Sequence, residues 1–191
     1  MAVTKKITMQ DDVFSGISAV FAVADGLPDG LDLSGTDLLE FPVSDDSGFN
    51  FDTGQPSIEH FKVKGLQTDW VNTFTPGDGE LTLEIPCNDT NILDLCFGTT
   101  GASAEVKLPS GVATGGTVGT GKSYPLTQNA VYLGLVILND TEDKLLFIKK
   151  GKFMAQIIFD GSNKPLCVVL TGTISAGAAT DAFGICTIAN P

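Results

Sequence analysis

The residues with the clearest chemical pattern lie between Gly116 and Ser123. Their sequence, GTVGTGKS, satisfies the G-x-x-x-x-G-K-[ST] pattern of a phosphate-binding loop, in which glycine amides and a helix N-terminus surround the phosphates. Such a loop follows a buried strand and leads into a helix. Here the preceding residues are SGVATG, and Pro125 falls within the turn that should be helical. We therefore expect this segment, including Lys122, to bind no nucleotide.

The other reactive side chains are poorly arranged for catalysis or metal binding. His60 is the only histidine, and its spacing identifies no catalytic partner. The acidic pairs Asp11–Asp12 and Asp45–Asp46 are adjacent, so in an extended chain their carboxylates point to opposite sides. The sequence has neither a calcium-loop spacing nor a CxxC zinc pattern. It therefore predicts a protein that is not an enzyme and has no catalytic, cofactor-binding or metal-binding residues.

The charge balance restricts the partners. The 191 residues are enough for one domain and include 11 lysines, no arginine and 23 acidic residues, which give a net charge of −12. This balance argues against a surface that neutralises the phosphates of nucleic acid or anionic lipid. The cysteines show no disulfide framework and are expected to be reduced thiols that serve as small hydrophobic residues. They are Cys87, Cys96, Cys167 and Cys186.

The N-terminal apolar run Val13–Ala24 has some features of a signal peptide. Asp11 and Asp12 directly precede it, however, whereas a secretory signal carries no acids there. The run also alternates with period two, as a half-buried strand does. We therefore expect no export signal. Because the sequence has no stretch of about 18 apolar residues, it also predicts no membrane-spanning helix.

Period-two alternation extends through most of the chain and predicts antiparallel strands. The expected strands are Val13–Ala24, Leu38–Val43, Ile58–Lys64, Asp69–Phe74, Leu81–Pro86, Val131–Leu138, Lys144–Ile148, Phe153–Asp160, Leu166–Ile174 and Ala182–Ala189. The exception is Asn88–Gly98, where Asn88 or Asp89 can cap a helix and Gly98 can end it. Ile92, Leu93, Cys96 and Phe97 would share the apolar face of this helix. The predicted fold class is mainly β: an antiparallel β-sandwich, or a sheet able to form a barrel, with one short flanking α-helix.

Glycine-containing segments predict the connections. Hairpin turns are expected at TPGDG (75–79), at Lys150-Gly151 and at DGSN (160–163). Asp25–Gly54 and Thr99–Gln128 are long, rich in glycine and poor in apolar runs. We expect them to be two long loop extensions of a single domain that spans residues 1–191.

The segment Glu80–Ile85 has one charged face. Glu80, Thr82 and Glu84 alternate with three apolar residues, so they lie on the opposite side of the strand from the core. This face is either a solvated surface or the lining of an acidic channel in an assembly. In a channel, like charges would keep DNA from binding to the wall.

Residues 55–98 run in the order strand, strand, PGDG turn, strand, Pro-Cys, capped helix and glycine. In the order and size of its elements this segment resembles the major tail tube proteins of long-tailed bacteriophages. In that family, a β-sandwich with one flanking helix forms rings, usually hexameric, whose sheets merge into a barrel around a DNA channel. Long loops and an N-terminal arm join one ring to the next.

The resemblance implies a structural virion protein of the phage tail, assembled in the host cytoplasm. Its partners would be copies of itself in stacked rings, other tail proteins, and DNA that passes without specific binding; no cofactor and no membrane are implied. Glu80, Thr82 and Glu84 would line the channel, and the glycine-rich segment would contact other subunits through Gly111, Gly115, Gly116, Gly119, Gly121 and Lys122. The alternatives are another structural virion protein (a head decoration, tail terminator or fibre-associated protein) or a non-viral ligand-binding β-sandwich module.

Overall fold

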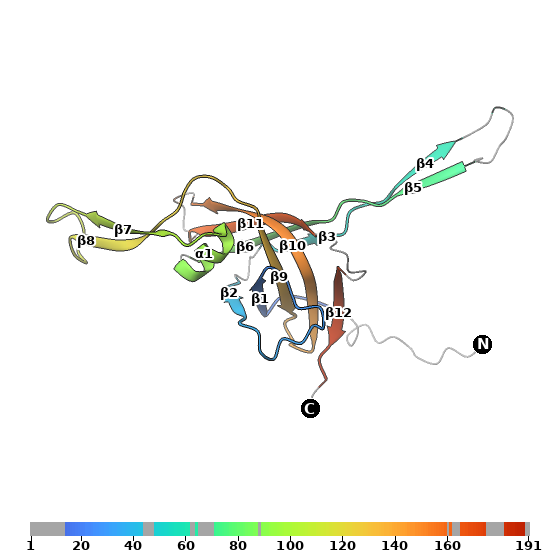
Figure 1. Cartoon of the computed structure of the whole chain (residues 1–191), viewed down its shortest axis with the longest axis horizontal. Helices are drawn as coiled ribbons and strands as arrows, with labels where there is room; N and C mark the ends of the chain where they lie inside the picture. The colour runs from blue at the N-terminus through green and yellow to red at the C-terminus, as the bar shows by residue number, and fades with distance from the viewer. Residues whose placement is uncertain are drawn as a thin grey trace.

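The protein is mainly β, with antiparallel sheets and one short helix, as the sequence predicts (Figure 1). The computed structural model describes residues 14–43, 48–61, 64, 71–87, 89–159, 161, 165–174 and 182–189. Their elements are β1 (Ala19–Ala24), β2 (Leu39–Phe41), β3 (Asn50–Asp52), β4 (Ser57–Phe61), β5 (Val71–Thr75), β6 (Glu80–Ile85), α1 (Thr90–Phe97), β7 (Ala102–Lys107), β8 (Val118–Ser123), β9 (Val131–Leu138), β10 (Lys144–Ile158), β11 (Cys167–Ile174) and β12 (Phe183–Thr187).

The main sheet has the strand order β2-β1-β9-β10-β11-β6-β3, and β12 pairs with the first half of β10. Within the described residues this sheet does not close into a barrel. The 15-residue strand β10 joins the two halves of the sheet, because its first half pairs with β12 and its second half with β11. Its register against β9 shifts between Ile148 and Gly151. The hairpin turn predicted at Lys150-Gly151 is therefore wrong: these residues form an irregularity inside one long strand.

The inner faces of both sheet halves form one hydrophobic core. Its fully buried side chains include Val20, Phe41, Leu81, Leu83, Ile85, Leu133, Leu135, Ile137, Ile148, Phe153, Val168 and Leu170. Helix α1 covers this core through the four residues that the sequence predicts, Ile92, Leu93, Cys96 and Phe97. A second, smaller cluster lies on the other side of β1 and β9 around Val23, Leu27 and Val136.

Local sequence determines both ends of α1. The Asp89 carboxylate accepts hydrogen bonds from the amides of Asn91 (2.7 Å) and Ile92 (3.4 Å), as an N-cap does. Gly98 adopts a left-handed conformation (φ 61°) and ends the helix. The other cap candidate, Asn88, lies outside the described residues. Among the described elements, no helix is long and apolar enough to span a membrane.

The extension predicted at residues 25–54 needs correction. Strands β2 and β3, which lie inside this segment, both pair with the main sheet. Leu27 is buried, and Leu31 and Leu33 pack beside it on the smaller cluster. Gly134 of β9 makes room for this loop, because a Cβ at Gly134 would lie 2.4 Å from the Leu27 nitrogen. The described part of this segment therefore packs against its own chain, although its composition is typical of a loop.

The hairpin turn predicted at residues 75–79 is wrong, because β5 and β6 on either side of it pair with other strands and not with each other. β3 and β6 pair as Asp52 with Glu80, and β4 and β5 pair as Ser57 with Thr75, so one register runs through both strand pairs. The strands cross closely between these pairs, since a Cβ on Gly77 would lie 2.4 Å from the Gly54 carbonyl carbon. β4 and β5, which the sequence assigns to the sandwich, are thus an outward extension of its edge (Figure 1).

Candidate functional site

The phosphate-loop pattern falls on a strand. Residues 118–123 are β8, which pairs with β7 in an antiparallel hairpin, so Gly119 and Gly121 lie in a ladder and no helix follows Ser123 directly. The amides of this segment are therefore not arranged around a helix N-terminus, the geometry on which phosphate binding depends.

The other candidate reactive groups remain dispersed. His60 is exposed on β4, where its Nδ1 lies 3.0 Å from Oδ1 of Asn72. Asp11, Asp12, Asp45 and Asp46 lie outside the described residues, and the described ones include no group of three His, Cys, Asp or Glu residues that could hold a metal ion. All four cysteines are free thiols.

The cysteines differ in burial. Cys96 is buried in the core, and burial raises the pKa of its thiol to about 12, with a smaller contribution from Cys87. This confirms its use as a small hydrophobic residue. Cys186, by contrast, is exposed on β12, so the same expectation is wrong there. β12 pairs only with β10 among the described strands, which leaves this side chain at an edge of the sheet.

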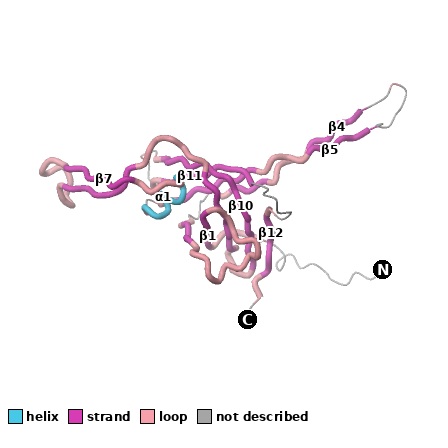
Figure 2. The backbone as a smooth tube through the Cα atoms, in the orientation of Figure 1, coloured by secondary structure: helices cyan, strands magenta, loops and turns pink. Residues whose placement is uncertain are grey.

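The most distinctive surface features are two β-ribbons that extend from opposite ends of the sheet (Figures 1 and 2). The first is the β4–β5 arm, residues 57–61 and 71–75. Every described side chain of this arm is exposed, including those of Ile58, Phe61 and Phe74 at 48%, 51% and 67%. A two-stranded ribbon that buries neither face is marginally stable in water on its own. This arm thus carries apolar side chains that nothing in the described part of the chain covers.

The second ribbon is the β7–β8 arm, residues 102–123, which occupies most of the predicted extension 99–128. Here the sequence correctly predicts a protruding segment, but the segment is an ordered hairpin and not an irregular loop. Gly111, Gly115 and Gly116 lie in the connection at its tip, while Gly119 and Gly121 lie on β8; all five are exposed. Val106 and Val118 are also more than half exposed.

Lys122, the remaining predicted contact residue, lies at the root of the arm and not at its tip. Its ammonium group is 2.5 Å from Oδ2 of Asp94 on helix α1. Oδ1 of the same carboxylate accepts hydrogen bonds from the Gly101 amide at 3.0 Å and the Tyr124 hydroxyl at 2.7 Å. The Tyr124 ring also stacks on Phe97, with 5.4 Å between ring centroids. We call Asp94, Gly101, Lys122 and Tyr124 the root cluster.

The electrostatics of the root cluster favour an ionised Asp94. The hydrogen bond from Lys122, followed by those from Gly101 and Tyr124, lowers the pKa of the Asp94 carboxyl to about 2. Desolvation and the hydrogen bond to Asp94 raise the pKa of Tyr124 to about 12. The carboxylate is thus held by donors from both sides of the arm and fixes the arm to the helix.

Glu80, Thr82 and Glu84 lie on one exposed sheet face, as their alternation predicts. Cross-strand pairing places Thr171 beside Thr82 and Val169 beside Glu84, and Met154 and Gln156 of β10 follow in the next strand. Asn50 and Asp52 continue the face on β3, and Lys152 pairs with Tyr132 at its other side. We call this surface, made of Asn50, Asp52, Glu80, Thr82, Glu84, Tyr132, Lys152, Met154, Gln156, Val169 and Thr171, the open sheet face.

The charges on the open sheet face are segregated. Asp52, Glu80 and Glu84 lie on β3 and β6, whereas Lys152 lies on β10. The Lys150 ammonium group lies 4.8 Å from the centre of the Tyr132 ring, which adds a second cation on the β10 side. Sequence analysis identified the acidic half of this face but not the basic half. Lys150 and Lys152 could not be assigned to it without knowing how β10 pairs.

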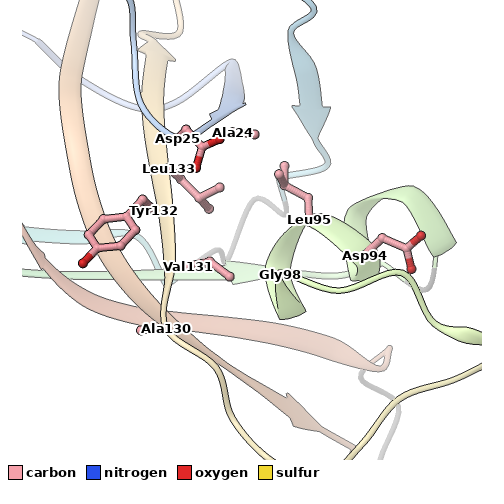
Figure 3. Close-up of a pocket in the computed structure, with 9 residues that line it drawn as sticks. All are labelled: Ala24, Asp25, Asp94, Leu95, Gly98, Ala130, Val131, Tyr132 and Leu133. Carbon is pink, nitrogen blue, oxygen red and sulfur yellow. The ribbon is translucent and has the colours of Figure 1, made fainter.

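A pocket of about 240 Å³ lies between helix α1 and the start of β9 (Figure 3). Its lining includes two carboxylates, Asp25 and Asp94, and they lie apart, with the apolar side chains of Leu95 and Leu133 between them. Asp94 is already bound in the root cluster. The pocket therefore presents no convergent set of polar groups of the kind that a catalytic or ligand site needs.

Comparison of the chain with models of known protein families finds no match, and comparison with curated proteins finds none either.

Proposed function

We propose that this protein is a structural subunit of a virion, whose copies form stacked homo-oligomeric rings that build the tail tube of a long-tailed bacteriophage. The observation that carries the proposal is the pair of largely exposed β-ribbons at opposite ends of one sheet. Each ribbon lacks a packed face, and each carries apolar side chains that water does not favour. Both features are expected of a subunit whose ribbons lie between other subunits.

The open sheet face supplies the second part of the proposal. In a ring, this face would line the channel, with Glu80, Thr82 and Glu84 repeated once per subunit. Thr and Gln side chains and an acidic half give a polar wall on its β3 and β6 side, and the cations that could hold phosphates are confined to Lys150 and Lys152 on the β10 side. The resemblance of residues 55–98 to tail tube proteins supports the same assignment, and the net charge of −12 agrees with a wall that does not retain DNA.

The test is the state of assembly of the purified full-length chain. Negative-stain electron microscopy and analytical ultracentrifugation should show rings or tubes whose mass is a multiple of 19.9 kDa. A variant in which a short Gly-Ser turn replaces residues 57–75 should keep the core and lose these assemblies. A wild-type chain that stays monomeric at high concentration, with normal sheet content by circular dichroism, contradicts the proposal.

A further inference from the structure

The second half of β10 extends beyond the strand that pairs with it on one side. The ladder between β9 and β10 ends where Val131 pairs with Phe153, whereas the ladder between β11 and β10 continues to Ile158. In an antiparallel strand the main-chain groups of successive residues point to opposite sides, so every second residue of 154–158 directs its N–H and C=O away from β11. Within the described part of the chain, no backbone hydrogen bond joins these groups to another strand, turn or loop. Residues 154–158 therefore form an open strand edge.

This open edge has none of the features that keep strand edges from pairing. Such edges are ordinarily protected by lysine, by proline or by a bulge. Residues 154–158 are Met, Ala, Gln, Ile and Ile, and the last lysine of β10 is Lys152. The irregularity of β10 also comes earlier, between Ile148 and Gly151. The open edge is therefore suited to pair with a further strand.

A groove of about 420 Å³ lies along the open edge, which forms one of its walls through Ala155, Gln156 and Ile157. The opposite wall is made by the end of α1 and the segment after β8, and its residues are Phe97, Tyr124, Pro125, Leu126 and Gln128. The lining thus combines apolar side chains with two amides and contains no Asp, Glu, Lys or His. The opposite wall is not built to pair with the edge, because Pro125 has no N–H and residues 124–130 form no strand.

We infer that this groove binds an extended, uncharged peptide segment of another protein, which adds to the main sheet as a strand beside residues 154–158. The open main-chain groups of β10 form hydrogen bonds with those of the segment, and the walls of the groove contact its alternate side chains. Gln128 and Gln156 supply amides for polar side chains of the segment. A charged side chain is disfavoured, because it would lose water in the groove without gaining an opposite charge.

The shape of the groove favours a single segment over the same edge of a second copy. The wall formed by residues 124–128 stands beside the open edge in every copy, so two such edges obstruct each other's approach. A lone extended segment needs only the space between the edge and this wall. The inference goes beyond the proposed function, because the groove involves neither β-ribbon tip and requires no ring.

The test is amide hydrogen exchange of the purified full-length chain, kept dilute, with a short synthetic peptide of alternating threonine and valine whose ends are blocked. At saturation the peptide should slow exchange about tenfold at those residues of 154–158 that face the groove. A control peptide with a methyl group on every amide nitrogen cannot donate to β10 and should bind about tenfold more weakly. In the chain, Ile157→Lys should weaken peptide binding by a similar factor, whereas Ile157→Val should not. Ile185→Lys makes the same change on an exposed residue of β12 and is the matched control.

Three results would overturn the inference, and none of them needs a variant to fold. Equal binding of the methylated peptide would show that the groove adsorbs apolar groups without adding a strand. Slow exchange throughout residues 154–158 of the dilute chain without peptide would show that the edge is already paired within the chain. Protection that appears without peptide as the chain concentration rises would identify a second copy as the occupant. The formation of rings is measured separately by microscopy, so the proposed function can fail or stand independently of this site.

Discussion

Reversing the charge of the acidic half of the open sheet face should convert it into a DNA-binding surface. At present this face carries three carboxylates, Asp52, Glu80 and Glu84, against the ammonium group of Lys152; with the adjoining Lys150 ammonium group, which lies over the Tyr132 ring, the net charge is −1. The double substitution Glu80→Lys and Glu84→Lys leaves one carboxylate and four ammonium groups, a net charge of +3. Both glutamates are exposed, and the side chains buried in the core belong to the residues next to them on the strand, so the fold should be retained.

The size of the effect follows from counterion release. The logarithm of a DNA affinity falls with the logarithm of salt concentration by about 0.9 for each phosphate that the protein neutralises. Two added lysines per subunit therefore steepen this slope by about 1.8 for each subunit that touches the duplex. Between 50 and 200 mM salt, the affinity should fall about tenfold more per engaged subunit than it does for the parent.

The assay is the fluorescence anisotropy of a labelled duplex titrated with assembled protein at several salt concentrations. The matched control is Asp29→Lys with Asp37→Lys, which makes the same charge change on exposed residues of the loop that leads to β2. If both double variants bind DNA equally, only net charge matters and the open sheet face has no special access to DNA. If Glu80→Lys with Glu84→Lys prevents assembly, this face is buried between subunits and does not line the channel.

Four further predictions concern the root cluster, the packed loop and the phosphate-loop pattern. Tyr124→Phe removes the hydroxyl that donates to Asp94 and should reduce the stability of the arm's attachment by about 1 kcal/mol, so amide hydrogen exchange at Gly101 should become about fivefold faster. Unchanged exchange would show that the phenol does not hold the arm. Because the pKa of Asp94 is lowered from 3.8 to about 2, the attachment of the arm should be complete above about pH 4 and lost as the pH falls through about 2. NMR should detect this transition, and Asp94→Asn should abolish it. Gly134→Ala places a methyl group 2.4 Å from the Leu27 nitrogen and should lower the thermal midpoint by several degrees, whereas Gly30→Ala, which meets no atom within 4 Å, should not. Calorimetry with ATP and magnesium should detect no binding, and saturable binding lost in Lys122→Ala would contradict this expectation.

Features of the fold that depend on neighbouring residues could be predicted from the sequence. Helix α1 and its buried face follow from a cap at Asp89, a left-handed glycine at Gly98 and apolar residues spaced for one side. The exposure of Glu80 and Glu84 follows in the same way from strict alternation along β6. Each of these features is determined by residues that lie within two helical turns or a few strand positions of one another.

Features that depend on distant pairing could not be predicted. β7 and β8 contain mostly Ala, Gly, Ser and Thr, which have weak or mixed strand preference, so only their mutual ladder defines them. Ile58 and Phe74 lie in segments that the sequence assigns to strands, and nothing local indicates that no second layer covers them. Asp94 is bound by residues 7, 28 and 30 positions later, and no pattern in the sequence connects them.

A single register runs from the β3–β6 pair into the β4–β5 arm, so the arm is connected through both of its strands to one edge of the main sheet. Residues 76–79 connect β5 to the strand that carries Glu80, and residues 53–56 connect the three-residue strand β3 to β4. A displacement of the arm would therefore act through two short covalent connections on the edge that bears Asp52 and Glu80. The two connections come into close backbone contact at Gly54 and Gly77, where no side chain separates them. A partner that held the arm would thereby also restrain the strands of this charged edge.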